Sequence, residues 1–116
     1  MTTAVIHQFY RLVDSGDVPG LVAMFAPDTT YRRPGYPPVH GRSGIEHFYT
    51  HERVIREGRH ELDSVVSTGD EVAVRGSFEG VLHDGTPAEH RFAEFFTLTP
   101  DNLIGRRETF FSAPLV

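Results

Sequence analysis

A glutamate set among phenylalanines is the residue of this chain best suited to move a proton. Glu94 lies in the run FAEFF at residues 92–96. Burial among aromatic side chains raises the pKa of a carboxyl group, which makes it a proton donor or base near neutral pH. A neighbouring arginine, Arg33 or Arg75, would act in the opposite direction and keep the carboxylate ionised. From the sequence, both outcomes remain open.

A predicted hairpin supplies the neighbours of Glu94. Asp84-Gly85 stands between two segments in which apolar and polar residues alternate, and Asp-Gly is typical of a two-residue turn. In that register the numbers of paired residues sum to about 169, so Arg75 faces Glu94. Because small-molecule sites combine apolar walls with a few polar groups, we expect this face to bind substrate through Arg75, Phe92 and Phe96. The alternative places the Arg75–Glu94 ion pair at an interface between the sheets of a dimer.

The second neighbour of Glu94 depends on the register of the last hairpin. A one-residue difference brings either Arg107 or Glu108 beside it. Two adjacent carboxyl groups would share a proton and act as an acid–base pair. An ion pair between Glu94 and Arg107 would be inert.

Three further side chains are candidates for substrate contact. Tyr31 and Arg33 are two residues apart on a predicted strand and share a face. If Arg33 points inward, it anchors an anion or a carbonyl oxygen and pairs with Glu94 or another carboxylate. If it points outward, it forms a surface ion pair. His60 precedes a strand predicted at 62–67 and reaches either the pocket or solvent.

No cofactor motif is present in the sequence. His47 and His51 are four residues apart on a predicted helix, but the stretch lacks the glutamate of the metalloprotease motif and no third ligand is assured. We expect no bound zinc. The chain has no cysteine, phosphate loop, dinucleotide fingerprint or nucleophile elbow, so we expect a cofactor-independent protein.

Composition limits the partners and the cellular location that we expect for the protein. The 116 residues carry a net charge of −5 with no basic run, which argues against a nucleic-acid partner. No apolar stretch approaches the roughly 20 residues of a membrane span, and the N-terminus does not resemble a signal peptide. We expect a cytoplasmic protein with a single domain over 1–116.

Hydrophobic periodicity predicts the elements that position these residues. Helices are expected at 3–15, from Asp17 to about Phe25, and at 43–57 with Ser43 as the capping residue. Tyr31 begins a short edge strand that runs into a proline-rich loop at the pocket mouth. Strands are expected at 62–67, 72–79, 88–98 and 103–112. Helices first and a meander last indicate an α+β fold.

This order, with the segment LVDSGDVPGLVAMFAPDTTYRRPG at residues 12–35, resembles the ketosteroid isomerase and SnoaL-like branches of the nuclear transport factor 2-like superfamily. The resemblance implies a cone-shaped, curved antiparallel sheet covered on one face by about three helices. It also implies a pocket for a small apolar molecule and a homodimer built through the sheet. The superfamily hosts isomerases, polyketide cyclases, epoxide hydrolases, dehydratases and binding modules, so the fold alone does not name an activity.

The residues of a steroid isomerase are only partly present. The position of its general base, just before a proline, holds Arg33 in this chain. The oxyanion-donating tyrosine of the first helix falls on Phe9, with Tyr10 beside it, and the second donor falls on Glu94. Because a cation cannot act as the base, the resemblance does not extend to steroid isomerisation by that mechanism.

These observations predict an acid–base enzyme for a small hydrophobic metabolite that performs isomerisation, cyclisation, hydration or epoxide hydrolysis. Glu94 carries the proton, and Arg33 or Arg75 holds developing negative charge. Substrate is oriented by Tyr10, Tyr31 and His60. The alternative is a binding or dimerisation module with the same cone and no chemistry. A homodimer is expected on the outer face of the sheet, through Val74, Phe95 and Phe111.

Overall fold

The computed structural model describes residues 2–112. The first half of the chain contains the helices and two strands. Their order is α1 (Thr2–Ser15), α2 (Val18–Ala23), β1 (Phe25–Arg32), β2 (Val39–His40), α3 (Gly41–His47) and the π-helical turn η1 (Phe48–Glu52). Four strands complete the described chain: β3 (Ile55–Thr68), β4 (Glu71–Leu82), β5 (Pro87–Leu98) and β6 (Ile104–Phe111). The predicted α+β class is confirmed.

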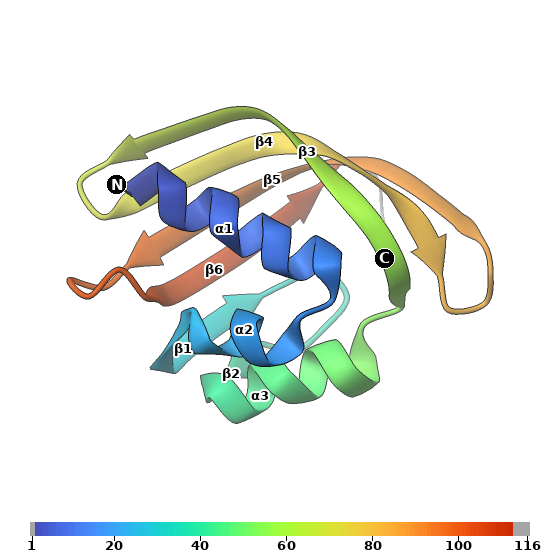
Figure 1. Cartoon of the computed structure of the whole chain (residues 1–116), viewed down its shortest axis with the longest axis horizontal. Helices are drawn as coiled ribbons and strands as arrows, with labels where there is room; N and C mark the ends of the chain where they lie inside the picture. The colour runs from blue at the N-terminus through green and yellow to red at the C-terminus, as the bar shows by residue number, and fades with distance from the viewer. Residues whose placement is uncertain (1, 113–116) are drawn as a thin grey trace.

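The strands form one curved sheet in the order β2-β1-β6-β5-β4-β3, and α1 lies across its concave face (Figure 1). The sheet is mixed, because β1 runs parallel to β6 while the other neighbours are antiparallel. The prediction of a wholly antiparallel sheet is therefore wrong for one pair. The predicted edge strand beginning at Tyr31 is also wrong, since β1 lies between β2 and β6.

The first two helices form where their local signals place them. Ile6, Phe9 and Val13 recur on one face of α1 and are buried, so this face packs into the cone. Asp17 caps α2 by accepting a hydrogen bond from the backbone N–H of Gly20. The second helix ends at Ala23, before the predicted Phe25, because residue 25 already begins β1.

The third helix differs from its prediction at both ends. It starts at Gly41 behind His40, so the capping box predicted at Ser43 is wrong. The reason is long-range: Arg42 donates from Nε to the carbonyl of Phe25 and fixes the first turn two residues earlier. The predicted extension to 57 is also wrong, because Ile55 is buried as the first residue of β3.

The β4–β5 hairpin closes one residue away from the predicted register. Gly85 is left-handed, with φ of 87°, and Leu82 is hydrogen-bonded to Thr86, so the loop has three residues instead of two. Val74 therefore pairs with Glu94, while Arg75 pairs with Ala93. Arg75 is exposed on the convex face, and the predicted Arg75–Glu94 pair is wrong.

The one-residue difference in register also changes which side chains lie on the convex face. Val74 is buried in the cone, and Phe111 packs against the core from its edge, so both are wrongly placed in the predicted dimer interface. The exposed large apolar residues of this face are Val66, Phe95 and Phe110, at 59%, 51% and 47% exposure. The Phe95 and Phe110 rings contact each other edge to face, with centroids 5.8 Å apart.

The homodimer stays a prediction, with its interface moved to these residues. Exposed phenylalanines on a sheet are stabilised by burial against a second copy. Sedimentation at micromolar concentration should give twice the 13.0 kDa of one chain, and replacing Phe95 with lysine should shift the mass toward the monomer. A wild-type protein that sediments as a monomer would contradict the prediction.

Candidate active site

Glu94 lies at the centre of the cone and is 1% exposed. Its Oε1 accepts a 2.5 Å hydrogen bond from the Tyr10 hydroxyl, and its Oε2 accepts one of 2.6 Å from Nε of Arg107. The Thr109 hydroxyl also donates to Oε2. The last hairpin thus selects Arg107 as the charged partner: Glu94 is opposite Thr109, while Glu108 pairs with Phe95. The predicted alternative of a Glu94–Glu108 carboxyl pair is wrong.

The environment keeps Glu94 ionised. Burial by itself raises the pKa of this carboxyl, but the charge of Arg107 and the hydrogen bonds from Arg107, Thr109 and Tyr10 outweigh it and lower the pKa below its ordinary value. Burial and the Glu94 charge raise the pKa of Tyr10 well above 10, so its phenol stays protonated and donates. Glu94 is therefore an anionic anchor that fixes three donors.

Aromatic rings hold the Arg107 guanidinium in the core. Its Cζ lies 4.2 Å from the ring centroid of Tyr31 and 4.7 Å from that of Phe9. Nη1 donates a 2.6 Å hydrogen bond to the Tyr49 hydroxyl. Arg107 thus has an anion on one side and aromatic faces around it, which stabilise a charge that is only 4% exposed.

Arg33 points inward, as one of its two predicted orientations requires, and is 8% exposed. Its Nη1 donates a 2.8 Å hydrogen bond to the Tyr31 hydroxyl, which in turn donates to Thr109 because the Thr109 hydrogen is used on Glu94. Arg33 is thereby linked to Glu94 through two hydroxyl groups. The expected ion pair with Glu94 is made by Arg107 instead.

A second acid–base arrangement joins α1 to β3. Nδ1 of His60 lies 2.6 Å from Oδ1 of Asp14, and the His60 backbone N–H donates to Oδ2 of the same carboxylate at 2.9 Å. A carboxylate can only accept, so Nδ1 carries the proton. None of the hydrogen bonds within residues 2–112 uses Nε2 of His60. The ring packs against Phe78, with centroids 4.8 Å apart, and its side chain is 10% exposed.

The two arrangements meet at a small inner cavity. It has a volume of about 10 Å³, which is room for about one water molecule, and His60, Glu94 and Arg33 all line it. His90 also lines it, and burial, followed by the charges of Arg33 and His60, lowers the pKa of His90. Its ring is therefore neutral near pH 7.

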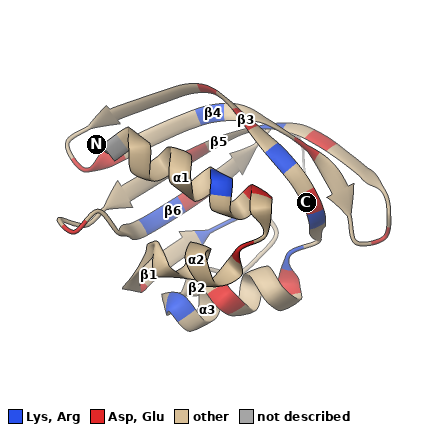
Figure 2. Ribbon diagram, in the orientation of Figure 1, with Lys and Arg blue, Asp and Glu red and all other residues tan. Residues whose placement is uncertain are grey.

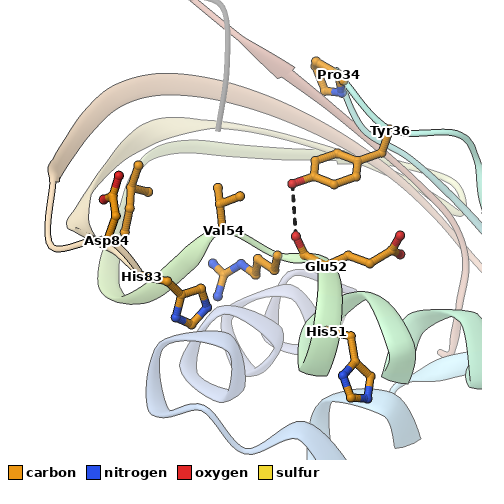
Figure 3. Close-up of a pocket in the computed structure, with 10 residues that line it drawn as sticks. Pro34, Tyr36, His51, Glu52, Val54, His83 and Asp84 are labelled. Carbon is orange, nitrogen blue, oxygen red and sulfur yellow. Dashed lines mark hydrogen bonds between the residues drawn. The ribbon is translucent and has the colours of Figure 1, made fainter.

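A larger cleft opens beside this cavity. It has a volume of about 680 Å³, within the range of small-molecule pockets, and its surface is mostly apolar. Pro34 and Tyr36 form one wall, His83 and Asp84 lie on the opposite side, and Val54 stands between them (Figure 3). Pro34, Gly35 and Tyr36 of the proline-rich loop line this cleft. Arg53 lines both the cleft and the inner cavity.

Most of the predicted site residues face the interior of the cone, and one lies outside it. Those that face its interior are Tyr10, Tyr31, Arg33, His60, Phe92, Glu94 and Phe96. Arg75 lies outside. Sequence reasoning missed Asp14 and Arg53. Asp14 had a usable signal, because it follows Tyr10 by four residues and so lies on the inward face of α1. Basic and acidic positions are interspersed over the helices and the sheet (Figure 2).

The two histidines His47, at the end of α3, and His51, in η1, are exposed. His47 and His51 have ring centroids 5.0 Å apart. Within residues 2–112, no group of three or more His, Cys, Asp or Glu side chains is placed to hold a metal ion. None of the helices in this part of the chain has the length and hydropathy that crossing a membrane requires.

The chain belongs to the SnoaL-like domain family, whose sequence profile matches residues 6–106, and so to the nuclear transport factor 2-like superfamily. Similar solved structures include an epoxide hydrolase/cyclase-like enzyme, SalBIII, described in pyran ring formation of the polyether salinomycin, with 23% identity and a TM-score of 0.85. The alignment covers 96% of this chain and 90% of SalBIII. TerC, crystallised with polyporic acid, has 25% identity and a TM-score of 0.84. The alignment covers 96% of this chain and 91% of the TerC chain.

A third similar structure is a nuclear transport factor 2-like protein of unknown function from Burkholderia pseudomallei, with 22% identity and a TM-score of 0.81. It is aligned over 96% of this chain and 90% of its own length. The predicted superfamily and the predicted cone are confirmed.

Proposed function

We propose that this chain is a cofactor-independent acid–base enzyme of the cyclase type that acts on a small hydrophobic metabolite, with His60 moving the proton. The observation that carries the proposal is the Asp14–His60 pair. Asp14 holds the ring through Nδ1, while the ring lines the inner cavity. An imidazole that a carboxylate orients through one nitrogen accepts a proton at the other.

The size of the inner cavity defines the reacting group. Room for about one water molecule suits a single hydroxyl or water beside His60. Nε2 takes the hydroxyl proton as its oxygen bonds to an electrophilic carbon of the substrate. In the same step the bond from that carbon to a second oxygen, as in an epoxide, breaks, and the imidazolium returns the proton to the oxygen that is released. No outside oxidant or reductant is needed.

Positive charge near the cavity suits the anionic oxygen that such a step develops. Arg33 lines the same cavity as His60 and is positioned by Tyr31. A guanidinium beside a developing oxyanion lowers the barrier, because the donors are already oriented in a site that excludes water. This assigns to Arg33 the stabilising role that the sequence suggested for it.

Glu94 takes a different role from the one expected from the sequence. A carboxylate that already accepts from three donors and pairs with Arg107 has a lowered pKa and is a weak base. We assign to it the positioning of Tyr10, Thr109 and Arg107. The proton-carrying role passes to His60, which also was a candidate from the sequence.

The similar enzymes support the reaction class. SalBIII is described as epoxide hydrolase/cyclase-like and connected with pyran ring formation, which joins an oxygen to a carbon. TerC was crystallised with polyporic acid, a small organic ligand. Membership in the SnoaL-like family and the mostly apolar cleft of about 680 Å³ agree with a hydrophobic substrate of comparable size.

A compound panel tests the proposal. Hydroxy-epoxides, cyclic ketones and polyketide-like aromatics are incubated with the protein, and products are followed by mass spectrometry. We expect conversion of at least one class without added metal or nucleotide. Binding of these compounds without any conversion would favour the non-catalytic binding module.

A further inference from the structure

Arg53 stands between the large cleft and the inner cavity. It follows η1 directly, and its backbone N–H closes the π-helical turn by donating to the carbonyl of Phe48. Its guanidinium lies over the Tyr49 ring, with Cζ 5.3 Å from the centroid. Because Arg53 lines both spaces, a ligand in the cleft lies against this side chain.

The guanidinium of Arg53 has no anionic partner among residues 2–112. The ion pairs in this part of the chain join Asp14 to His60, Asp63 to Arg91 and Glu94 to Arg107. Nε of Arg53 is shielded from solvent and makes no hydrogen bond to the described residues. A partly buried cation without an anionic partner is unfavourable, and an anion that enters the site relieves that cost.

Neighbouring cations strengthen the preference for an anion. Burial is the main cause that lowers the pKa of Arg53; the charges of Arg33 and Arg107 lower it further, while Tyr49 and Tyr31 act in the opposite direction. The same positive field that disfavours a third guanidinium attracts a negative ligand group. Glu52 and Asp84 line the cleft as well, but both are exposed to solvent, where their charges are screened.

We propose that Arg53 binds a carboxylate, or an equivalent singly charged oxyanion, on an otherwise hydrophobic substrate. A planar guanidinium matches the two oxygens of a carboxylate, and the apolar walls of Val54, Leu82 and Tyr36 accommodate the body of the ligand (Figure 3). The catalytic role of this anion site rests on the proposed function. A substrate held by Arg53 would direct its reacting end toward the inner cavity and His60.

Binding of a matched acid and amide tests it. The affinity of 2-naphthoate and of the neutral, nearly isosteric 2-naphthamide is measured by calorimetry at 0.15 M salt, about physiological ionic strength. Wild-type protein should bind the acid at least about tenfold more tightly, as expected for a charge-assisted contact. In Arg53→Met this preference should vanish, and Arg53→Lys should retain part of it.

The variants carry their own controls. Arg75→Met removes an exposed arginine from the convex face and should leave the preference unchanged. Arg53→Met should not lower the melting temperature, because it removes a cation without an anionic partner in residues 2–112. A wild-type protein that binds neither probe, or binds both equally, overturns the proposal, as does a preference that survives Arg53→Met.

The same data separate this proposal from the catalytic one, because naphthoate binding needs no turnover. If the panel gives no product while the Arg53-dependent preference holds, the anion site stands and the proposed enzyme does not. If turnover occurs without an acid preference, the proposed enzyme stands and the anion site does not.

Discussion

Replacing Glu94 with glutamine should lower the free energy of unfolding by about 3–5 kcal/mol, a large share of the stability of a small domain. The substitution leaves the Arg107 guanidinium, 4% exposed, without its anion. It also places an amide NH₂ against donors that need an acceptor, since Tyr10 and Thr109 both donate to the carboxylate. Urea unfolding followed by circular dichroism measures the effect.

A surface ion pair of equal length provides the control. Arg91 and Asp63 are also 2.6 Å apart, but their side chains are 54% and 36% exposed. Arg91→Gln should cost less than about 1 kcal/mol, because exposed pairs are screened by water. The double variant Glu94→Leu/Arg107→Leu should be more stable than Glu94→Gln alone. A Glu94→Gln protein within about 1 kcal/mol of wild type would contradict this role of the pair.

The same pair sets a direction for acid stability. The folded environment lowers the pKa of Glu94 below its ordinary value of 4.5, so its contribution is fully present above about pH 4.5. That contribution is lost as the pH falls through the lower folded value. The stability of wild type should therefore decline between these two values more steeply than that of Glu94→Gln, which has no carboxyl to protonate at this position.

Replacing His60 with glutamine should reduce kcat by about 10²–10⁴-fold on whichever panel compound is converted. Glutamine keeps a side chain of similar size but has no basic nitrogen to accept the proton. KM should change little, because the cleft walls and Arg53 are left in place. Stopped assays at several substrate concentrations separate the two constants.

Two further variants test whether the loss of activity is specific to His60 and its partner. Asp14→Asn keeps the size of the side chain that holds His60 and should lower kcat by about tenfold or more, with KM nearly unchanged. His47→Gln alters an exposed histidine on α3 and should leave kcat at the wild-type value. Full activity in His60→Gln would remove His60 from the mechanism and return the proton-carrying role to another group.

Local signals explain what the sequence predicted well. The apolar face of α1 and the Asp17 cap of α2 depend on residues within a few positions of each other, and both are confirmed. The residues of β5 also face as predicted, since Phe92, Glu94 and Phe96 alternate along one strand and share a side.

The errors come from choices that local sequence leaves open. Asp84-Gly85 can close a loop of two residues or of three with a left-handed glycine, and the second choice moves Arg75 to the convex face. Arg53 was assigned to the interior of a helix, which instead ends at Glu52 because Ile55 joins the sheet. Asp14 and His60 are 46 residues apart, and only the packing of α1 on β3 brings them together.

The protonation of the His60 ring tests the central claim most directly. Selective ¹⁵N labelling of histidine, with NMR spectra recorded at alkaline pH, where imidazoles are neutral, distinguishes the two ring nitrogens. The Asp14 contact predicts a protonated Nδ1 and an unprotonated Nε2 whose signal shifts when a ligand enters the cone. A proton on Nε2, or an Nε2 signal that no bound ligand perturbs, would contradict the assignment of His60 as the proton-moving group.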